Sequence, residues 1–312
     1  MKTTHGSDFF ALGSFLILGL LFLGLFVTPS FASMPTPKIQ HVIIIMMENE
    51  SYRAIFGTPN GTYEQQLAQK YSSAGNYYAI TSQASLPNYL GILGGYYFHF
   101  KNTNNDPTKT NGINAFNLVD LLEAKGLTWK SYNQDIPKPC YQKDFGPSNY
   151  TVHHDPFVYF NDIRHNDKKC DNVVGFDQLF TALRENNLPN FSFIVPNDFN
   201  NSHDTGPAFG DHWLSSFVPL IIHSPSFSST VLFIIYDEPS GNNHHGFGTG
   251  KYSVHGGRVP LILVSPFANM GFRSPDLYSP YSLLATVEKI FGLGTLGRGD
   301  ATTTSMNDLF SK

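Results

Sequence analysis

The feature that most restricts the fold is an apolar segment that ends abruptly in polar residues. Residues 40–47 are dominated by a continuous run of aliphatic, mostly β-branched side chains, and Glu48 and Asn49 follow directly. A run of this kind is typical of a strand that is buried on both faces of a parallel sheet. Such a strand would deliver Glu48 and Asn49 to the carboxyl edge of the sheet, which is where ligands bind in open α/β folds.

Further apolar segments predict a sheet of several strands with helices between them. We expect strands at 77–81, 128–132, 191–195, 230–236 and 259–264, and helices at 114–125, 211–223 and 281–291. The helix at 114–125 is the clearest, because its apolar residues gather on one side and Gly126 follows its end. Alternating strands and helices predict an α/β fold in which helices cover both faces of a mainly parallel sheet.

Acidic residues follow the predicted strands, at the carboxyl ends where ligands bind in parallel sheets. Asp198 comes soon after the strand at 191–195, and Asp237 and Glu238 follow directly after 230–236. Carboxylate and amide oxygens are suitable ligands for a divalent cation, which would lower the pKa of a nearby hydroxyl and neutralise a phosphate. Each acidic pair alone also fits a solvated turn, but two such pairs that close two long apolar strands favour a shared site.

Ser85 is the predicted nucleophile. The segment around it leaves a strand and enters a helix, and Pro87 stands in the first turn, where its missing N–H is not needed. At a helix start, unpaired amides and the positive end of the dipole favour a phosphoryl group and a serine alkoxide. The alternative is a simple N-cap serine. Asn88, one turn later, is expected to donate to a non-bridging phosphate oxygen, the alternative being a surface asparagine.

Histidines near other strand ends are candidates for a second metal or for phosphate contacts. His203 lies among oxygen ligands, His255 precedes the strand at 259–264, and His154 lies in a long loop. Taken singly, each also fits an ordinary surface or core histidine. The full set of candidates for this role is His154, Asn197, Asp198, His203, Asp204 and His255.

The N-terminal segment indicates export. Lys2 precedes an apolar run at 9–27, and small residues suited to signal peptidase follow at 28–33. Residues 1–33 are therefore interpreted as a signal peptide, or as an uncleaved N-terminal anchor, since the run is nearly long enough to span a bilayer. Residues 34–312 are interpreted as one catalytic domain outside the cytoplasm, secreted or tethered to a membrane.

Cys140 and Cys170 are the only cysteines of the chain. In an oxidising compartment two cysteines of this kind are expected to form one disulfide that closes a loop. The alternatives are two free thiols or a metal pair, although their separation lacks the close pairing of zinc sites.

Charge and loop composition bear on the partner. The formal net charge is -4, with both signs mixed along the chain, so no basic surface indicates nucleic acid as a partner. Residues 96–113 and 133–172 are long, irregular and rich in Asn, Tyr and His. Segments of that length inside a compact domain are usually functional. We expect both to form walls of a substrate cleft.

Ordered sequence blocks resemble a known family. They lie at 41–49, 85–89, 121–132, 154–157, 196–197, 203–204, 236–238 and 286–293. In this order they are similar to the phosphoesterase family that contains bacterial phosphatidylcholine-type phospholipases C and secreted acid phosphatases. That family belongs to the alkaline phosphatase superfamily. The resemblance covers about residues 39 to 302 and implies a three-layer α/β/α sandwich.

The resemblance also implies roles for individual residues. It places Glu48, Asn49, Ser85, Asp237 and Glu238 around a metal, with Ser85 taking the phosphoryl group and Asn88 supporting it. One or two divalent ions are expected, with Zn, Mn, Mg, Ca and Fe as candidates. This chain departs from relatives with two metals, because Asp198 and His203 are five residues apart and Asn201 stands where those relatives often carry Asp.

The resulting hypothesis is metal-dependent hydrolysis of a phosphoric ester through a phosphoserine. The substrate would be a small-molecule or lipid phosphate ester. One alternative is an exported surface or binding protein that kept the fold without catalysis. Another is a sulfatase-like hydrolase, but sulfatases usually carry a Cys/Ser-x-Pro-x-Arg segment, and here the residues after Ser85 read Leu-Pro-Asn-Tyr.

Overall fold

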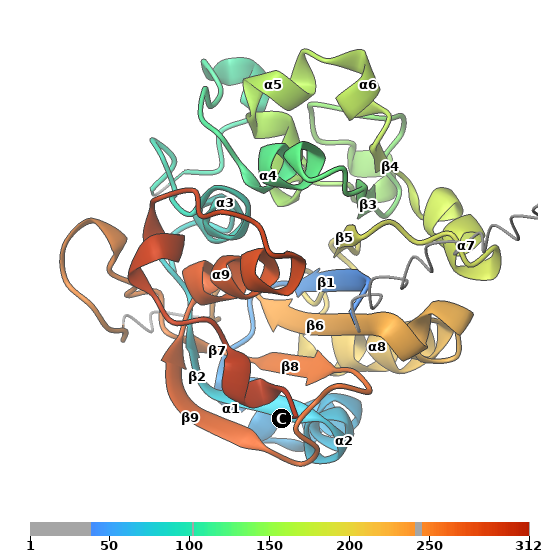
Figure 1. Ribbon diagram of the computed structural model, residues 1–312, viewed down its shortest axis with the longest axis vertical. Helices are drawn as coiled ribbons and strands as arrows, with labels where there is room; N and C mark the ends of the chain where they lie inside the picture. Colours follow the sequence, from blue (N-terminus) through green and yellow to red (C-terminus); the bar gives the residue numbers. More distant parts are fainter. Residues whose placement is uncertain (1–38, 102, 241–244, 312) are drawn as a thin grey trace, which may run out of the picture. The chain divides into compact units, whose positions relative to one another are not determined.

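The computed structural model describes residues 39–101, 103–240 and 245–311, and their strands form one nine-stranded sheet (Figure 1). The strands are β1 (His41–Met47), β2 (Ser72–Tyr78), β3 (Trp129–Asn133), β4 (Val173–Val174), β5 (Phe191–Val195), β6 (Thr230–Tyr236), β7 (Arg258–Val259), β8 (Leu261–Val264) and β9 (Arg273–Tyr278). Their order is β4-β3-β5-β1-β6-β8-β2-β7, and β9 pairs with β2.

The centre of the sheet is parallel and apolar. β1 lies between β5 and β6 and is parallel to both, and β3 continues the parallel set beyond β5. All residues of β5 and β6 are buried, and so is β1 after its first residue. The mainly parallel sheet that the apolar runs predict is therefore confirmed.

The other side of the sheet contains antiparallel pairs, and here the strand limits differ from the prediction. β8 is antiparallel to both β6 and β2. The strand expected at 259–264 is divided at Pro260 into β7 and β8, because proline has no N–H to donate to a sheet. The strand expected at 77–81 is β2, which ends at Tyr78, and the residues after it form a loop leading to Ser85.

The α-helices are α1 (Tyr52–Phe56), α2 (Thr62–Lys70), α3 (Leu86–Gly94), α4 (Leu118–Ala124), α5 (Asn161–Arg164), α6 (Asp167–Cys170), α7 (Phe176–Arg184), α8 (Pro207–Ile222) and α9 (Pro280–Phe291). The three helices expected at 114–125, 211–223 and 281–291 are present as α4, α8 and α9, with different ends, and the described residues contain further helices. α4 begins later than expected because Asn117 and Asp120 form a capping box at its start. α8 begins earlier than expected, with Pro207 in its first turn.

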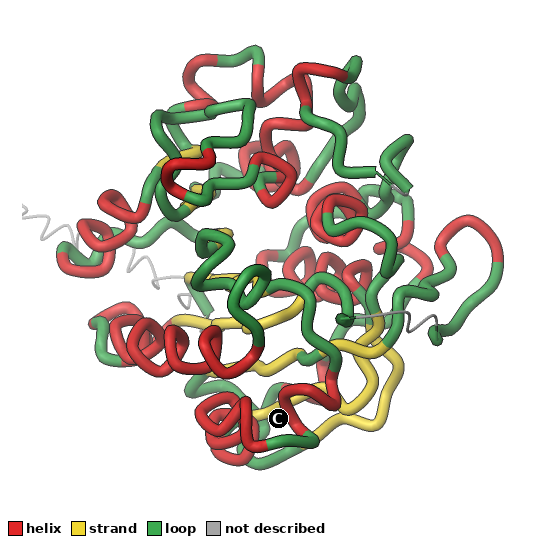
Figure 2. Tube along the Cα trace, turned by 180° about the vertical axis from the view of Figure 1, so that it is seen from behind, coloured by secondary structure: helices red, strands yellow, loops and turns green. Residues whose placement is uncertain are grey.

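Helices cover both faces of the sheet. α9 lies over the face turned toward the viewer in Figure 1, and α3 packs beside it. α8 covers the opposite face, which Figure 2 turns toward the viewer, and packs against α2. The three-layer α/β/α arrangement is thus confirmed, and the helices bury both sides of the apolar central strands.

The segment 133–172 is less irregular than expected. It contains α5, α6 and several short 3-10 helices, among them Val152–His154 and Pro156–Tyr159. The disulfide expected between Cys140 and Cys170 is present. It ties the end of α6 to the start of this segment, which supports a long connection that leaves the sheet after β3.

Among the described residues, no helix combines the length and apolar character that a membrane span requires. The signal peptide or anchor expected at 1–33 lies outside the described residues.

Candidate active site

The carboxyl ends of three adjacent strands bring the predicted acidic residues together. Glu48 follows β1, Asp198 follows β5 and Asp237 follows β6, and β1 is the middle strand of the three. The backbone joins two of these ends directly, because the amide of Asp237 donates to the Met47 carbonyl at 3.1 Å. The convergence that the sequence predicts at this edge of the sheet is therefore present.

Asn49 connects the first and third strand ends through its backbone. It adopts a left-handed conformation with a φ of 58°, a region that asparagine tolerates better than most residues. This conformation lets its amide donate to Asp237 Oδ1 at 2.9 Å. The turn after β1 thus fixes the direction of the Asp237 carboxylate.

Ser85 points its hydroxyl at the acidic cluster rather than at its own helix. It is the N-cap residue of α3, yet its side chain makes no capping hydrogen bond. Instead Ser85 Oγ donates to Glu48 Oε2 at 3.1 Å, and the serine is only 3% exposed. The explanation of Ser85 as a simple N-cap serine therefore does not account for where its side chain lies.

The first amide of α3 already has a partner. The Leu86 N–H donates to Asn104 Oδ1 at 3.1 Å, and Pro87 has no N–H. An anion bound at this helix start would therefore have to displace Asn104 to use the Leu86 amide. Asn104 belongs to the segment 96–113, so this predicted cleft wall does contact the helix that begins at Ser85.

Asn88 braces the loop that carries Ser85. Its Oδ1 accepts hydrogen bonds from the Ile80 amide at 2.8 Å and the Thr81 amide at 3.2 Å. Its Nδ2 donates to the Thr81 carbonyl at 3.0 Å and to the Ala84 carbonyl at 3.2 Å. The amide is fully buried and fully used by the backbone, so Asn88 supports Ser85 through the loop, and its direct contact with a phosphate stays a prediction.

Two further side chains hold Glu48 from the opposite side. The Tyr89 hydroxyl donates a short hydrogen bond to Glu48 Oε1, and His154 Nε2 lies 3.3 Å from the same oxygen. The rings of Tyr89 and His154 stack with centroids 5.6 Å apart. Both rings are buried, which fixes the Glu48 carboxylate in one orientation toward Ser85.

His154 joins Glu48 to Asp198. Its Nδ1 lies 3.0 Å from Asp198 Oδ1, and Thr151 donates a short hydrogen bond to the other oxygen of Asp198. Burial raises the pKa of Asp198, but the adjacent His154 outweighs this effect and brings the pKa down to about 2. Asp198 therefore stays ionised and orients the imidazole.

Burial makes the carboxylates around Ser85 hard to ionise. It raises the pKa of Glu48 well above its ordinary value, and the neighbouring Asp237 raises it further. The pKa of Asp237 is also raised, mainly by burial, and burial together with Asp237 raises the pKa of Glu238 to about 9. Three acidic groups in one buried space favour protonation of some of them unless a cation balances the charge.

The donor set around Ser85 fits a divalent cation. Asp237 Oδ2 and Glu238 Oε2 are buried without a hydrogen-bond partner among the described residues. Buried orphan oxygens of this type are the ligands that hard cations prefer. Glu48, Asp237 and Glu238 are not gathered within 4.8 Å of one another, so a shared cation would draw at least one of them inward.

A second group of ligands is more tightly gathered. Asp198, His203 and Asp204 offer ligand atoms that all lie within 4.8 Å of one another, the one such trio of acidic, histidine or cysteine side chains within the described ranges. His203 Nδ1 lies 2.7 Å from Asp204 Oδ1. The ring of His203 is 5.8 Å from that of His154, so this group adjoins the Glu48 cluster.

Asn197 and His255 lie apart from that group. Asn197 donates to Asp135 at 2.6 Å and accepts the Asn200 amide at 3.0 Å, so its side chain is part of a turn. His255 is exposed, and its amide donates to the Ile80 carbonyl at 3.1 Å. It faces a pocket beside the Ser85 loop.

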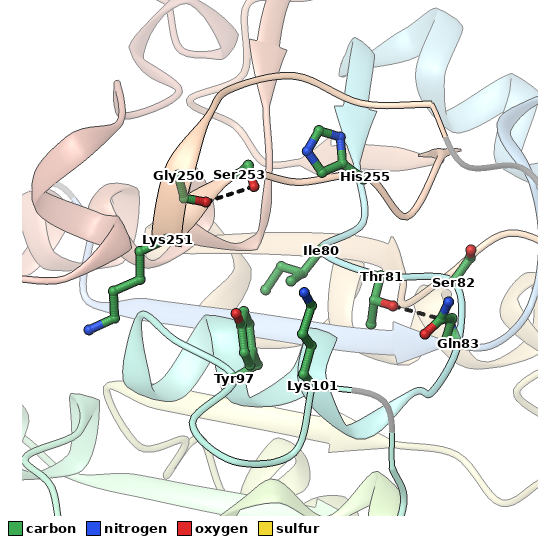
Figure 3. A pocket seen from close by; sticks show the side chains of 10 residues that line it. All are labelled: Ile80, Thr81, Ser82, Gln83, Tyr97, Lys101, Gly250, Lys251, Ser253 and His255. Atoms are coloured by element: carbon green, nitrogen blue, oxygen red, sulfur yellow. Dashed lines mark hydrogen bonds between the residues drawn. The ribbon is translucent and has the colours of Figure 1, made fainter.

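Figure 3 shows this pocket, which has a volume of about 250 Å³. One wall is the segment from Ile80 to Gln83, which precedes Ser85, and His255 lies beside Ile80. Lys101 and Lys251 also line it. The pocket therefore joins the segment 96–113 to the loop that carries Ser85.

Sequence reasoning missed several residues of this site. Sequence patterns give no role to Tyr89, Thr151, Asn104 and Lys101. The first three form hydrogen bonds with distant residues, and Lys101 lines the pocket. Tyr89 alone carried a signal, because it closes the Ser-x-Pro-Asn-Tyr block and lies one helical turn after Ser85.

The chain is similar in sequence to known proteins. The chain matches the Phosphoesterase family over residues 61–294. It is 31% identical over 265 residues to a probable acid phosphatase of Kluyveromyces lactis, a match that covers 82% of this chain and 59% of that protein. It is 28% identical over 267 residues to a phosphatidylinositol-3-phosphatase of Mycobacterium tuberculosis, covering 85% of this chain and 81% of that protein.

The chain also resembles a solved structure in its fold. It is shorter than its fungal relatives. A protein of the alkaline phosphatase superfamily from Vibrio parahaemolyticus superposes with a TM-score of 0.53 at 13% identity, covering 87% of this chain and 72% of that chain. At that identity the likeness concerns the fold alone. The fungal acid phosphatases are longer, and this chain spans 49% to 59% of their length.

The family match runs from α2 to the end of α9 and contains Ser85, Asn88, His154 and the carboxyl ends of β5 and β6. On these grounds, the chain belongs to the phosphoesterase family.

Proposed function

We propose that this chain is a metal-dependent phosphoric ester hydrolase in which Ser85 is the nucleophile and a phosphoserine is the intermediate. One observation carries the proposal. The Ser85 hydroxyl makes no capping hydrogen bond to its helix and donates instead to Glu48 at 3.1 Å, inside a buried acidic cluster. A binding protein without catalysis has no need of a buried serine held in this way. Family membership supports the same class of reaction.

Glu48 is the group placed to accept the proton of Ser85. Tyr89 and His154 hold the Glu48 carboxylate in position, and Asp198 in turn orients His154. Glu48 Oε2 already accepts the hydrogen bond of the Ser85 hydroxyl at 3.1 Å. This chain of contacts keeps the proton acceptor aligned with the hydroxyl.

Glu48, Asn49, Ser85, Asp237 and Glu238 are the residues that would hold a divalent cation. When bound, the cation would lower the pKa of the Ser85 hydroxyl and offset the negative charge of the phosphoryl group. Asp198, His203 and Asp204 form the candidate second site, with His154 between the two groups. The buried orphan oxygens of Asp237 and Glu238 support the first site.

The reaction then has two balanced steps. Ser85 Oγ forms a bond to phosphorus as its proton passes to Glu48, and the bond from phosphorus to the substrate oxygen breaks. The leaving oxygen takes a proton from solvent and departs as an alcohol. Water next attacks the phosphorus of the phosphoserine and gives up a proton to solvent. The bond from phosphorus to Ser85 Oγ breaks, Glu48 returns its proton to Oγ, and orthophosphate leaves. The net change is one ester and one water converted to an alcohol and orthophosphate.

A phosphomonoester or the headgroup of a phospholipid is the proposed substrate class. This proposal draws on the printed names of the relatives, which include acid phosphatases and a phosphatidylinositol-3-phosphatase. We also propose that the chain acts outside the cytoplasm, because disulfides persist in oxidising compartments and Cys140 is bonded to Cys170.

The test uses the full purified chain on phosphomonoesters, phosphodiesters and sulfate esters, before and after chelation and metal add-back. We expect phosphate esters to be hydrolysed, activity to disappear on chelation, and add-back to restore it. Asp237→Asn should lower metal content and rate together by more than about tenfold. Asp276→Asn, an exposed residue on β9, is the control and should leave both unchanged.

Other outcomes separate the alternatives. Hydrolysis of sulfate esters alone would favour the sulfatase-like alternative, and no hydrolysis of any ester would favour a binding protein. Full activity in a sample shown by elemental analysis to be metal-free would refute the metal requirement. It would leave Glu48 and His154 as the activating groups for Ser85.

A further inference from the structure

The pocket beside the Ser85 loop is basic. Its lining residues include Lys101, Lys251 and His255 but no carboxylate. Neither lysine forms an ion pair with an acidic residue in the part of the chain that the structure describes. The acidic cluster at Ser85 and this positive pocket therefore lie on adjacent stretches of the same loop.

The two lysines differ in where their ammonium groups lie. The Lys251 ammonium sits over the Tyr96 ring, 4.5 Å from its centroid, and 5.3 Å from the centroid of the Tyr252 ring. These contacts hold it at the rim, and Figure 3 shows it directed away from His255. In the same view Lys101 directs its ammonium toward Ile80 and Thr81, the wall of the pocket.

The pocket lies beside the stretch of loop that leads to Ser85. Gln83 lines the pocket and is two residues before Ser85, so their Cα atoms are at most about 7 Å apart. Asn88 fixes this loop by its hydrogen bonds to the Ile80 and Thr81 amides. The pocket, with Lys101 in its lining, therefore lies beside the proposed point of attack.

We propose that this pocket is a leaving-group subsite for a second anionic group of the substrate, and that Lys101 is its specificity-determining residue. The proposal rests on the proposed function, because it takes Ser85 as the point of attack. Ser82, Gln83 and Ser253 are further polar residues in the lining of the pocket. The favoured substrates are phosphomonoesters whose alcohol carries a carboxylate or another phosphate.

A pair of similar substrates tests this subsite. The leaving group of 3-phosphoglycerate carries a carboxylate, whereas that of glycerol 3-phosphate carries a hydroxyl at the same place. We expect kcat/KM to favour 3-phosphoglycerate by about fivefold at low salt, the size of a strong exposed ion pair, and high salt to weaken the preference. Lys101→Met should bring the ratio close to one, and Lys101→Glu should reverse it.

Matched variants distinguish a direct contact between Lys101 and the substrate from an effect of the overall charge of the protein. Lys251→Met removes the same charge at the rim and should lower the ratio less than Lys101→Met. Lys138→Met removes an exposed charge outside the pocket and should leave the ratio unchanged. A wild-type ratio near one, or equal losses in all three methionine variants, would overturn the proposal.

A binding measurement keeps the subsite separate from the proposed function. Calorimetry on Ser85→Ala gives the Kd of both ligands without any chemistry. We expect the same preference for 3-phosphoglycerate, lost in Ser85→Ala/Lys101→Met. Absence of turnover by the wild type together with this preference would count against the proposed function alone, whereas equal Kd values would overturn the subsite alone.

Discussion

The Ser85→Ala substitution separates the catalytic role of a serine at a helix start from its structural role, and the chain offers a matched control. Ser279 is also an N-cap serine that precedes a proline, at the start of α9, and its side chain takes part in a capping box with Ser282. Ser85 makes no cap and donates to Glu48 instead. The two serines are equally buried, at 3% and 2% exposure.

The expected magnitudes follow from these contacts. Ser85→Ala removes one hydrogen bond to a buried carboxyl, so it should change the free energy of unfolding by about 1 kcal/mol. Ser279→Ala removes a helix cap, which also costs about 1 kcal/mol. Their effects on catalysis should differ, because loss of a nucleophile lowers kcat by at least about 1,000-fold, whereas loss of a distant cap should leave kcat close to the wild-type value.

The assay combines thermal unfolding with steady-state hydrolysis of a phosphate ester for the wild type and both variants. Similar melting temperatures with activity lost only in Ser85→Ala would support the nucleophile. If Ser85→Ala retains activity within tenfold of wild type, or if both variants lose activity in proportion to stability, the assignment of Ser85 is wrong.

Three more outcomes are expected. Tyr89→Phe removes a hydrogen bond that lowers the pKa of Glu48, so the acid limb of the kcat/KM pH profile should move to higher pH, and an unmoved limb would exclude Glu48 as the base. Burial raises the pKa of Glu288 from 4.5 to about 8, so the folded state keeps a proton that the unfolded state loses. Melting temperature should therefore fall as pH rises through that window, and Glu288→Gln should flatten the fall. Cys140→Ser/Cys170→Ser should lower the free energy of unfolding by about 2 to 4 kcal/mol in denaturant titration, and two titratable thiols in the unreduced wild type would contradict the bridge.

The sequence could predict the central sheet because its strands are buried on both faces. β1, β5 and β6 are almost wholly apolar, and their parallel order places Glu48, Asp198 and Asp237 at one edge. β2 and β9 carry no such signal. β2 is rich in small and polar residues, and β9 exposes most of its side chains at the margin of the sheet. β4 has only two residues, too few for any periodicity.

The sequence predicts which residues of the candidate site follow the strands. It does not predict the contacts that hold those residues in place. The stacking of Tyr89 on His154 and the hydrogen bond from the Leu86 amide to Asn104 depend on where two loops return to the sheet. Loop paths of this kind are set by tertiary packing rather than by local pattern. The position of Asn88 shows the same limit, because its spacing from Ser85 fits a phosphate donor, whereas its amide bonds to the loop backbone.

The central claim is that a phosphoryl group passes through Ser85. The most direct measurement is an acid quench during turnover of a phosphate ester, followed by peptide mass spectrometry of wild type and Ser85→Ala. The account predicts one added phosphoryl group on the peptide that contains Ser85 in the wild type, and none in the variant. Turnover without a phosphorylated peptide, or phosphorylation at another residue in both proteins, would contradict it.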